Sequence, residues 1–379
     1  MANVLIVDDS SDTVEQSAQV AGLRHVDPDT LSGLKRVRRG AGFAYLDSRG
    51  RRHREPATLE RIRKLAIPPA WDDVWICPIA NGHIQARGRD ARRRKQYRYE
   101  PRWLEMRSAT KFHRMIDFAA ALPRIRNACD RDMRRRELSR DKVLATLVRL
   151  LEVTHIRVGN EEYARTNGSY GLTTLRDRHV RIHGAELLFR FRGKSGQARQ
   201  VGICDRRLAR IVGECSDLPG HELFQYVAED GTPHGVDSSD VNGYIRGVAG
   251  KEFTAKDFRT WAGTVLAACT LRALAPCATR GRAKKNVVQC IKTVAAALGN
   301  TPSVCKRSYV HPAVLDSYLR GSLASTRARG DEAFVRALLA REGKAVESAF
   351  CRAPRVGAVS PTRRRTRSSP PRGPGTAAP

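Results

Sequence analysis

Four polar residues with charged or reactive side chains stand in segments rich in glycine, proline and other polar residues. Two of them are arginines, Arg157 and Arg259, and the other two are Lys194 and Tyr309. A guanidinium group is a permanent, planar cation that can hold two oxygen atoms of one anion. An ammonium group can donate a proton, and a phenol oxygen can act as a nucleophile. Together, these residue types suit a substitution reaction at an oxyanion.

Each of these residues also has an ordinary interpretation. Tyr309 could be a half-buried tyrosine of a helix, which is the commoner role of a single tyrosine. The two arginines could pair at a surface with the nearby carboxylates of Glu161 and Asp257, as most arginines do. Lys194 could simply be solvated at a turn. The order and local context of the four residues have to decide between these interpretations.

The composition indicates the kind of partner. The chain of 379 residues has 69 lysines and arginines against 39 aspartates and glutamates, a formal net charge of +30. Such a charge favours a polyanionic partner, and nucleic acid is the first candidate. A membrane surface is the competing polyanion, but the sequence has no run of about 18 apolar residues and no dominant basic amphipathic helix. We therefore expect a nucleic-acid partner and no membrane.

The elements that position Lys194 are predicted to be β-strands. Short extended segments are expected over Gly171–Leu175, Val180–Ile182, Leu187–Arg192 and Ala198–Val201. The last two are joined by the sequence Gly-Lys-Ser-Gly-Gln, in which Gly193 and Gly196 permit a hairpin turn. Lys194 would lie at the tip of this hairpin.

The segment before Tyr309 has the signals of a helix start. Thr301 can cap a helix, and Pro302 can occupy its first position. Tyr309 would then lie in the third turn of that helix, which is compatible with a role in a core or in a site.

The chain divides into two folded domains between two tails. Residues 1–30 carry six acidic residues and one arginine, and we expect a disordered acidic leader. Residues 31–106 predict a small β-rich domain, and residues 107–350 predict a larger, mostly helical domain with a small β-sheet, so the fold class is α+β. Residues 353–379 contain six arginines and no acidic residue, and we expect a disordered basic tail that can lie along phosphates.

The small domain is predicted from short signals. Extended segments are expected at Phe43–Leu46, Val74–Cys77, His83–Arg87 and Gln96–Tyr99. Thr58 is expected to cap a short helix that continues to Leu65.

The cysteines and histidines indicate neither disulfides nor a metal site. The nine cysteines are scattered, odd in number and form no Cys-x-x-Cys pair, which favours free thiols in a reducing cytoplasm. The apolar stretch Val4–Val7 is too short for a secretory signal. His155, His179, His183 and His311 have no metal-ligand spacing. We expect a cytoplasmic protein without a metal or a small-molecule cofactor.

Four fragments in a fixed order carry a resemblance to a known family. They are RVGN at Arg157, RGKSG at Lys194, KDFRTW at Arg259 and LGNTPSVCKRSY at Tyr309. Each fragment alone is weak, but together they resemble the bacterial, poxvirus-like type IB DNA topoisomerases. Beyond these enzymes, the chain is similar to the tyrosine recombinases. The resemblance covers roughly residues 22–322.

The resemblance implies a reaction at a phosphodiester of double-stranded DNA. Tyr309 resembles the family nucleophile, which would form a 3′-phosphotyrosyl bond with one strand. Arg157 and Arg259 would clamp the phosphate oxygens, and Lys194 would protonate the leaving 5′ oxygen. Because the covalent bond keeps the phosphate bond energy, religation needs no ATP, and because guanidinium groups stabilise the charge, no metal is required. A monomer would relax positive and negative supercoils by rotation about the intact strand.

One position departs from part of the family. Where the poxvirus-like enzymes have a histidine ahead of the tyrosine, in a segment similar to Gly299–Ser303, this chain has Asn300. An amide can donate a hydrogen bond to a phosphate oxygen but cannot act as an acid at neutral pH. We expect Asn300 to belong to the catalytic set through hydrogen bonding alone.

The resemblance also implies DNA contacts outside the catalytic set. The sequence KQYRY at residues 95–99 is similar to the family segment that reaches into a DNA groove. There Gln96 could bond an adenine edge, and the two tyrosines could contact bases or phosphates. The expected DNA-binding residues are Lys95, Gln96, Tyr97, Tyr99 and Lys256. Just before them, this chain has Arg93 where the bacterial pattern usually has glycine.

Two alternative functions remain open on the sequence. A site-specific tyrosine recombinase shares the chemistry but assembles four protomers and usually exchanges a C-terminal helix between them. A basic, non-catalytic DNA-compaction protein would explain the net charge and the arginine-rich tail, and it would not need Tyr309.

Overall fold

The structure is a computed structural model that describes residues 11–91, 93–274 and 279–352. The described residues up to Ala340 form one compact unit. The predicted basic tail at 353–379 lies outside the described residues, as do residues 1–10 of the predicted leader. In the described ranges, no helix combines the length and the apolar character needed to cross a membrane.

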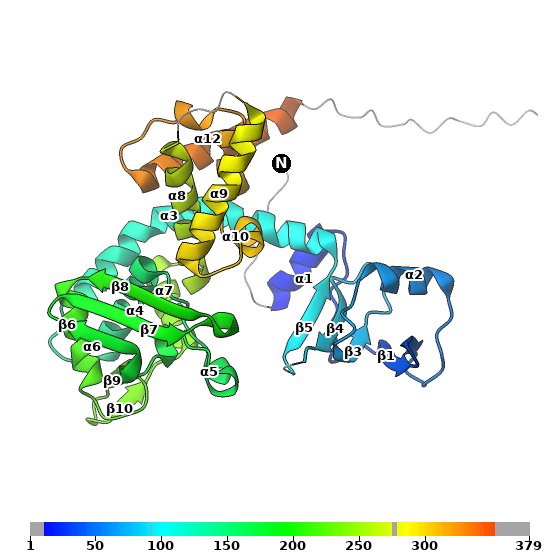
Figure 1. Cartoon of the computed structure of the whole chain (residues 1–379), viewed down its shortest axis with the longest axis horizontal. Coiled ribbons are helices and arrows are strands. Elements are labelled where there is room, and N and C mark those ends of the chain that lie inside the picture. Colours follow the sequence, from blue (N-terminus) through cyan, green and yellow to red (C-terminus); the bar gives the residue numbers. More distant parts are fainter. Residues whose placement is uncertain (1–10, 92, 275–278, 353–379) are drawn as a thin grey trace, which may run out of the picture. The chain divides into compact units, whose positions relative to one another are not determined.

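A five-stranded antiparallel sheet forms the N-terminal part, as Figure 1 shows. Its strands are β1 (Leu34–Arg39), β2 (Gly42–Leu46), β3 (Asp72–Ile76), β4 (Ile84–Arg89) and β5 (Lys95–Tyr99), in the order β2-β1-β3-β4-β5. Apolar residues of one face pack with Ile62 of helix α2 (Pro56–Lys64). The small β-rich domain is therefore confirmed, and β5 is an edge strand.

Two details of this domain differ from the sequence prediction. Strand β1 was not predicted, because four of its six residues are lysine or arginine. Arg36 is nevertheless half-buried, and its guanidinium donates to the carbonyl oxygens of Pro68 (3.0 Å) and Trp71 (2.6 Å). Helix α2 begins at Pro56, with Glu55 as its N-cap, so the prediction that Thr58 caps it is wrong.

Residues 11–30, which precede the sheet, are folded. Helix α1 (Ser11–Val20) is followed by a segment whose Leu23 is buried, and Ala18 and Leu23 pack against Trp103. The prediction of a disordered leader is therefore wrong for residues 11–30. That prediction rested on the acidic residues, whereas a few apolar side chains suffice to hold the segment against helix α3 (Pro101–Asp132).

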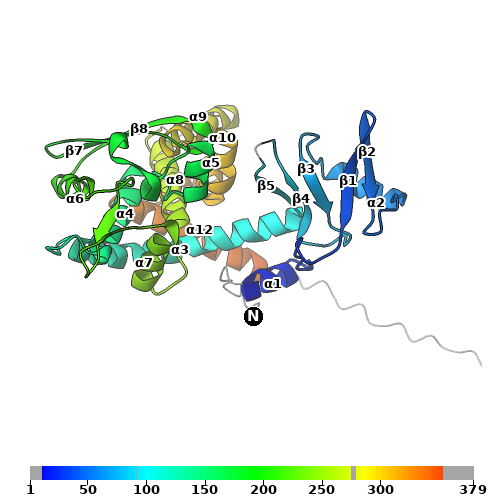
Figure 2. The same cartoon turned by 90° about the horizontal axis from the view of Figure 1, so that it is seen from below.

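Helix α3 (Pro101–Asp132) follows β5 directly and runs as one long helix (Figure 2). It starts six residues before the predicted boundary at 107, because Glu100 caps it by accepting a hydrogen bond from the Arg102 amide (2.6 Å) and Pro101 fills its first position.

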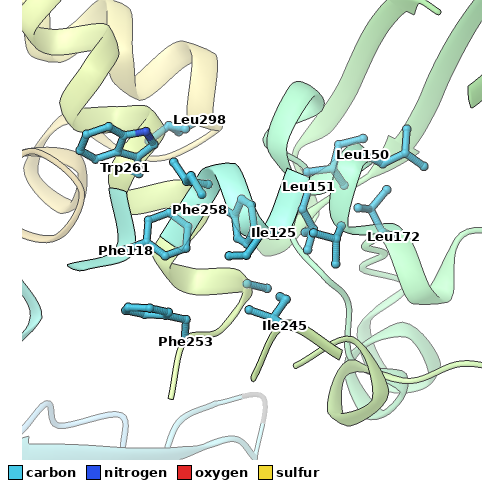
Figure 3. Packing of buried hydrophobic residues seen from close by; sticks show 14 of the residues in the cluster. Phe118, Ile125, Leu150, Leu151, Leu172, Ile245, Phe253, Phe258, Trp261 and Leu298 are labelled. Atoms are coloured by element: carbon cyan, nitrogen blue, oxygen red, sulfur yellow. The ribbon is translucent and has the colours of Figure 1, made fainter. Parts of the chain in front are cut away.

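A largely helical domain surrounds one large hydrophobic core. Helices α3, α4 (Arg140–Thr154), α7 (Ser238–Ala249), α8 (Ala255–Arg272) and α9 (Arg280–Leu298) contribute most of it. Figure 3 shows Phe118 and Ile125 of α3 lying among Leu151, Ile245 and Phe258 from three other helices. The chain continues through α10 (Pro302–Ser308), α11 (Pro312–Leu319) and α12 (Asp331–Arg352).

A three-stranded antiparallel sheet is inserted among these helices. It has the order β6-β7-β8, with β6 at Val180–His183, β7 at Glu186–Arg192 and β8 at Ala198–Cys204, and it packs with helix α6 (Arg206–Ser216). A hairpin of β9 (Gln225–Val227) and β10 (Pro233–Gly235) follows. The predicted α+β fold class, a β-rich N-terminal domain followed by a mostly helical one with a small sheet, is confirmed.

The predicted strand at Gly171–Leu175 is wrong. Leu172–Thr174 form a 3-10 turn, which follows helix α5 (Glu161–Asn167). The hydroxyl of Thr174 accepts a hydrogen bond from the Gly171 amide (3.0 Å), and this closes the turn locally. Such side-chain bonding competes with strand formation and is not visible in an alternating pattern.

Candidate active site

Arg157 lies in a short segment that leaves the end of α4. His155, in a left-handed conformation, caps that helix, and the Arg157 carbonyl then accepts a hydrogen bond from the Leu172 amide (2.8 Å). The Arg157 guanidinium reaches the loop after α9, where it donates to the Gly299 carbonyl (3.0 Å) and to the side-chain oxygen of Asn300. A sequence separation of more than 140 residues is thus bridged by one side chain.

Arg259 approaches the same loop from helix α8. It is 5% exposed, and its guanidinium donates to the carbonyls of Leu298 (2.7 Å) and His155. Its central carbon lies 5.3 Å from the centre of the Tyr309 ring. Within the described part of the chain, both arginines donate to carbonyl and amide oxygens and neither has a carboxylate partner, so their interpretation as paired surface arginines is wrong.

The two guanidinium groups make this region strongly electropositive. Burial, and then repulsion from Arg259, lower the pKa of Arg157 to about 10. Burial likewise lowers the pKa of Arg259. Because both stay charged at neutral pH without a carboxylate, an anion placed beside them would be stabilised.

Tyr309 ends helix α10. Thr301 caps this helix by accepting the Val304 amide (3.4 Å), and Pro302 is its first residue, as predicted. Because α10 ends at Ser308, Tyr309 is its C-cap residue and does not lie in a third turn. The Tyr309 carbonyl accepts from the hydroxyl of Thr264 on α8 (3.3 Å), which ties the tyrosine backbone to the helix of Arg259.

Two buried N–H groups at this site have no hydrogen-bond partner within the described residues. They are the side-chain nitrogen Nδ2 of Asn300 and the Nε of Arg259. A buried donor without an acceptor costs about 1–3 kcal/mol. Oxygen atoms of a bound anion would supply the missing acceptors.

Lys194 lies at the tip of the β7–β8 hairpin, as predicted. The Gly193 amide bonds the Gln197 carbonyl (2.8 Å), and Lys194 and the next two residues form the turn. The Lys194 side chain is exposed, and within the described ranges it makes no hydrogen bond to the other candidate residues. The structure thus brings together Arg157, Arg259, Asn300 and Tyr309, and it leaves Lys194 on a separate turn.

The expected DNA-binding residues of β5 lie on two faces of the strand. Lys95, Tyr97 and Tyr99 are exposed on one face, and the two tyrosine rings stack with centroids 5.9 Å apart. Gln96 lies on the opposite face, where its amide donates to Asp90 (3.0 Å). Because successive side chains of a strand alternate, Gln96 and the tyrosine pair present different surfaces. Lys256 is exposed in the first turn of α8.

Sequence reasoning missed two residues at this site. Lys111 of α3 donates to the Ser308 carbonyl, and its ammonium lies 5.1 Å from the centre of the Tyr309 ring. Lys111 shares a helical stripe with the buried Met115 and Phe118, so a charge at an apolar position was the signal. The second residue, Arg199 of β8, bonds the end of α9, and no pattern in the sequence marks it.

Comparisons with known proteins agree with this fold. The family model of the eukaryotic DNA topoisomerase I catalytic core matches residues 95–328, and that of the bacterial DNA topoisomerase IB N-terminal domain matches residues 42–90. DNA topoisomerase 1B of Acanthamoeba polyphaga mimivirus is 35% identical over 296 residues, which cover 76% of this chain and 88% of the relative. DNA topoisomerase 1B of vaccinia virus (strain Copenhagen) is 23% identical over 237 residues, 60% of this chain and 70% of the relative.

A solved structure of the XerH site-specific recombinase bound to palindromic difH substrate aligns with a TM-score of 0.32 and 13% identity, over 50% of this chain and 47% of the other. This alignment is too weak to support an argument. The family models and the curated relatives place the chain among the DNA topoisomerases, with DNA as its substrate. Within that class, the chain belongs to the type IB family, in its bacterial and poxvirus-like branch.

Proposed function

We propose that this topoisomerase nicks one strand of duplex DNA through a 3′-phosphotyrosyl bond to Tyr309, allows rotation about the intact strand, and religates. It acts as a monomer, needs neither ATP nor a metal, and relaxes supercoils of both signs. The observation that carries the proposal is the convergence of Arg157, Arg259 and Asn300 beside Tyr309. Three separate segments of the chain supply these residues, because Asn300 and Tyr309 lie in one of them.

Arg157, Arg259 and Asn300 bind the scissile phosphate. The two unpaired buried donors, Nε of Arg259 and Nδ2 of Asn300, are suited to the non-bridging oxygens. The transition state carries more charge on these oxygens than the ground state does, so fixed donors stabilise it preferentially. The hydrogen bond between Arg157 and the Asn300 oxygen leaves the amide nitrogen as the donor for the phosphate.

The covalent step exchanges one ester for another. The Tyr309 phenol gives its proton to a water molecule, its oxygen forms a bond to phosphorus, the bond from phosphorus to the 5′ oxygen breaks, and Lys194 gives a proton to that leaving oxygen. Religation reverses each movement, because the 5′ hydroxyl attacks the phosphotyrosine and returns its proton. No net bond energy is lost, so the cycle requires no ATP.

DNA contacts outside this site come from β5 and α8. The exposed tyrosine pair with Lys95 offers aromatic and cationic contacts on one face of an edge strand. Gln96 reads a base edge from the other face, and Lys256 contacts a phosphate.

The start of α12 argues against the recombinase alternative. Phe334, Val335, Leu338 and Leu339 are buried in the main core of their own chain. The guanidinium of Arg126 makes two hydrogen bonds to Glu332 (2.7 and 2.9 Å), and the Trp261 indole donates to the same carboxylate (3.0 Å). Exchange of this helix between protomers would have to break these contacts, which favours a protein that acts alone.

Plasmid relaxation tests the proposal. The wild type, Tyr309→Phe and Tyr226→Phe are incubated with positively and negatively supercoiled plasmid in EDTA without ATP, and covalent complexes are trapped with detergent. We expect the wild type and Tyr226→Phe to relax both plasmids and form the adduct, and Tyr309→Phe to do neither while still binding DNA. Relaxation by Tyr309→Phe, or a requirement for metal or ATP, would overturn the proposed mechanism. DNA retardation without relaxation by the wild type would favour a compaction protein.

A further inference from the structure

Arg199 connects the lysine hairpin to the loop that carries Asn300. It lies on β8, opposite Phe191 of β7 and three residues after the turn that holds Lys194. Its guanidinium donates to the carbonyls of Ala296 (3.2 Å) and Ala297 (3.0 Å), in the last turn of α9. Gly299 and Asn300 follow that turn directly. One side chain therefore joins two elements that bear candidate catalytic residues.

Two glycines make room for this side chain. A Cβ atom added at Gly193, between β7 and the turn that holds Lys194, would lie 3.1 Å from Cγ of Arg199. A Cβ atom added at Gly299 would lie 2.7 Å from its Nη1, and Gly299 also has a φ of +60°. The Arg199 side chain thus lies between Gly193 of the β7–β8 hairpin and Gly299 of the loop that carries Asn300. A solvated surface arginine needs no such space on both sides.

The contact is also electrostatically favourable. The last carbonyl groups of a helix carry partial negative charge, so a cation there is stabilising, although the Ala296 carbonyl also accepts the Gly299 amide (3.1 Å). Burial lowers the pKa of Arg199, but the group stays charged at neutral pH because an arginine starts far above it. The hairpin is therefore held by β8 close to its turn, whereas the Lys194 side chain in the turn has no such bond among the described residues.

We propose that Arg199 is a positioning residue for proton transfer by Lys194. By fixing β8, close to the turn, to the end of α9, it sets where the ammonium of Lys194 can lie relative to Asn300 and Tyr309. This inference rests on the proposed function, since it assumes that Lys194 protonates the leaving 5′ oxygen. It adds a residue that touches neither the phosphate nor the nucleophile.

A sulfur substitution separates this role from a general structural one. The preferred cleavage site of the wild type is mapped first, and duplexes are then made with either oxygen or sulfur as the 5′ bridging atom of that phosphate. A thiolate is a good leaving group that needs no proton, so the sulfur duplex bypasses Lys194. Single-turnover cleavage is measured for the wild type, Lys194→Ala, Arg199→Ala, Arg199→Lys and Arg190→Ala. Arg190 is an exposed arginine of the same hairpin and serves as the matched control for charge.

We expect Arg199→Ala to cleave the oxygen duplex about 100-fold more slowly than the wild type, within the range of a lost general acid. On the sulfur duplex, Arg199→Ala and Lys194→Ala should both cleave within about threefold of the wild type. Arg199→Lys should be intermediate, because an ammonium cannot reproduce the fork of a guanidinium. Arg190→Ala should resemble the wild type on both duplexes.

A glycine variant gives a second test that leaves Arg199 in place. Gly193→Ala should displace the Arg199 side chain and show the same selective rescue on the sulfur duplex. Gly202 lies on β8 like Arg199, but a Cβ atom there would have only ordinary contacts, so Gly202→Ala should cleave both duplexes like the wild type. If Arg199→Ala is equally slow on both duplexes while Lys194→Ala is rescued, the inference is wrong. If the wild type forms no adduct, or Lys194→Ala is not rescued, the proposed function itself fails.

Discussion

The guanidinium of Arg157 donates to the side-chain oxygen of Asn300, which fixes the orientation of the amide. The amide nitrogen of Asn300 is then buried without a partner in the described part of the chain. A histidine at this position could change its charge near neutral pH, but an amide cannot. The Arg157–Asn300 pair therefore offers a hydrogen-bond donor whose strength does not depend on pH.

Replacing Asn300 tests this donor. We expect Asn300→Ala to slow single-turnover cleavage by about 100-fold, as the loss of one oxyanion donor does, with little change in DNA affinity. Asn300→Asp should be slower still, because its carboxylate would pair with Arg157 and repel the phosphate. Asn300→His should retain activity and gain a dependence on pH between about 5 and 8. Equal rates for the alanine variant and the wild type would exclude the donor role.

Lys111 gives a prediction on stability and pH. Burial lowers the pKa of Lys111 to about 8, from 10.5 in an unfolded chain. Between these pH values the unfolded state binds more protons, so the contribution of Lys111 to stability rises as pH increases from 8 to 10.5 and is lost as pH falls through 8. The free energy of unfolding of the wild type relative to Lys111→Met should therefore increase by up to about 3 kcal/mol between pH 7.5 and 10.5.

Urea unfolding of both proteins at the two pH values measures this difference, and Lys292→Met, at an exposed position of α9, is the control. Lys111→Met should also slow cleavage by about tenfold, because Ser308 and the Tyr309 ring lose a cationic neighbour. A pH-independent stability difference would show that Lys111 is solvated.

His311 predicts a loss of stability in acid. Burial lowers the pKa of His311 to about 4, and its Nδ1 accepts the Ala313 amide (3.1 Å) as the N-cap of α11. The folded state thus holds a neutral imidazole, so this contribution is fully present above about pH 6.5 and is lost as pH falls towards 4. The loss amounts to at most about 3 kcal/mol.

His311→Asn keeps a cap acceptor but does not titrate in this range. Its free energy of unfolding should therefore fall less than that of the wild type between pH 7 and 4.5, as measured by urea unfolding. His83, whose pKa burial also lowers to about 4, remains in the variant and accounts for a residual loss. Identical acid profiles for the two proteins would contradict the role of His311.

The sequence predicted elements whose signals are local. The Gly-Lys-Ser-Gly-Gln turn and the Thr301–Pro302 helix start depend on a few neighbouring residues, and both were confirmed. The convergence of Arg157 with Asn300 came from the family resemblance, since no periodicity links residues so far apart. Arg199 was missed because its partners are main-chain carbonyls, which every residue has. A hydrogen bond to a main-chain carbonyl therefore cannot be predicted from the types of the residues.

Arg93 adopts a backbone conformation that favours glycine. Its φ is +61°, and its amide donates to the Asp90 carbonyl (2.7 Å) in the turn before β5. An L-residue other than glycine costs about 1 kcal/mol in this region, and the side chain of Arg93 is exposed. The turn is therefore formed although Arg93 has a Cβ atom and a positive φ.

We expect Arg93→Gly to raise the free energy of unfolding by up to about 1 kcal/mol, whereas Arg93→Ala, which loses the same charge but keeps a Cβ atom, should not. Both variants should weaken DNA binding equally and reduce its salt dependence by about one phosphate contact if Arg93 lies against the backbone of the duplex. Thermal unfolding and salt-dependent binding distinguish the two effects. If the glycine and alanine variants have the same free energy of unfolding, the positive φ at residue 93 has no energetic cost. The charge of Arg93 would then be the property that matters at this position.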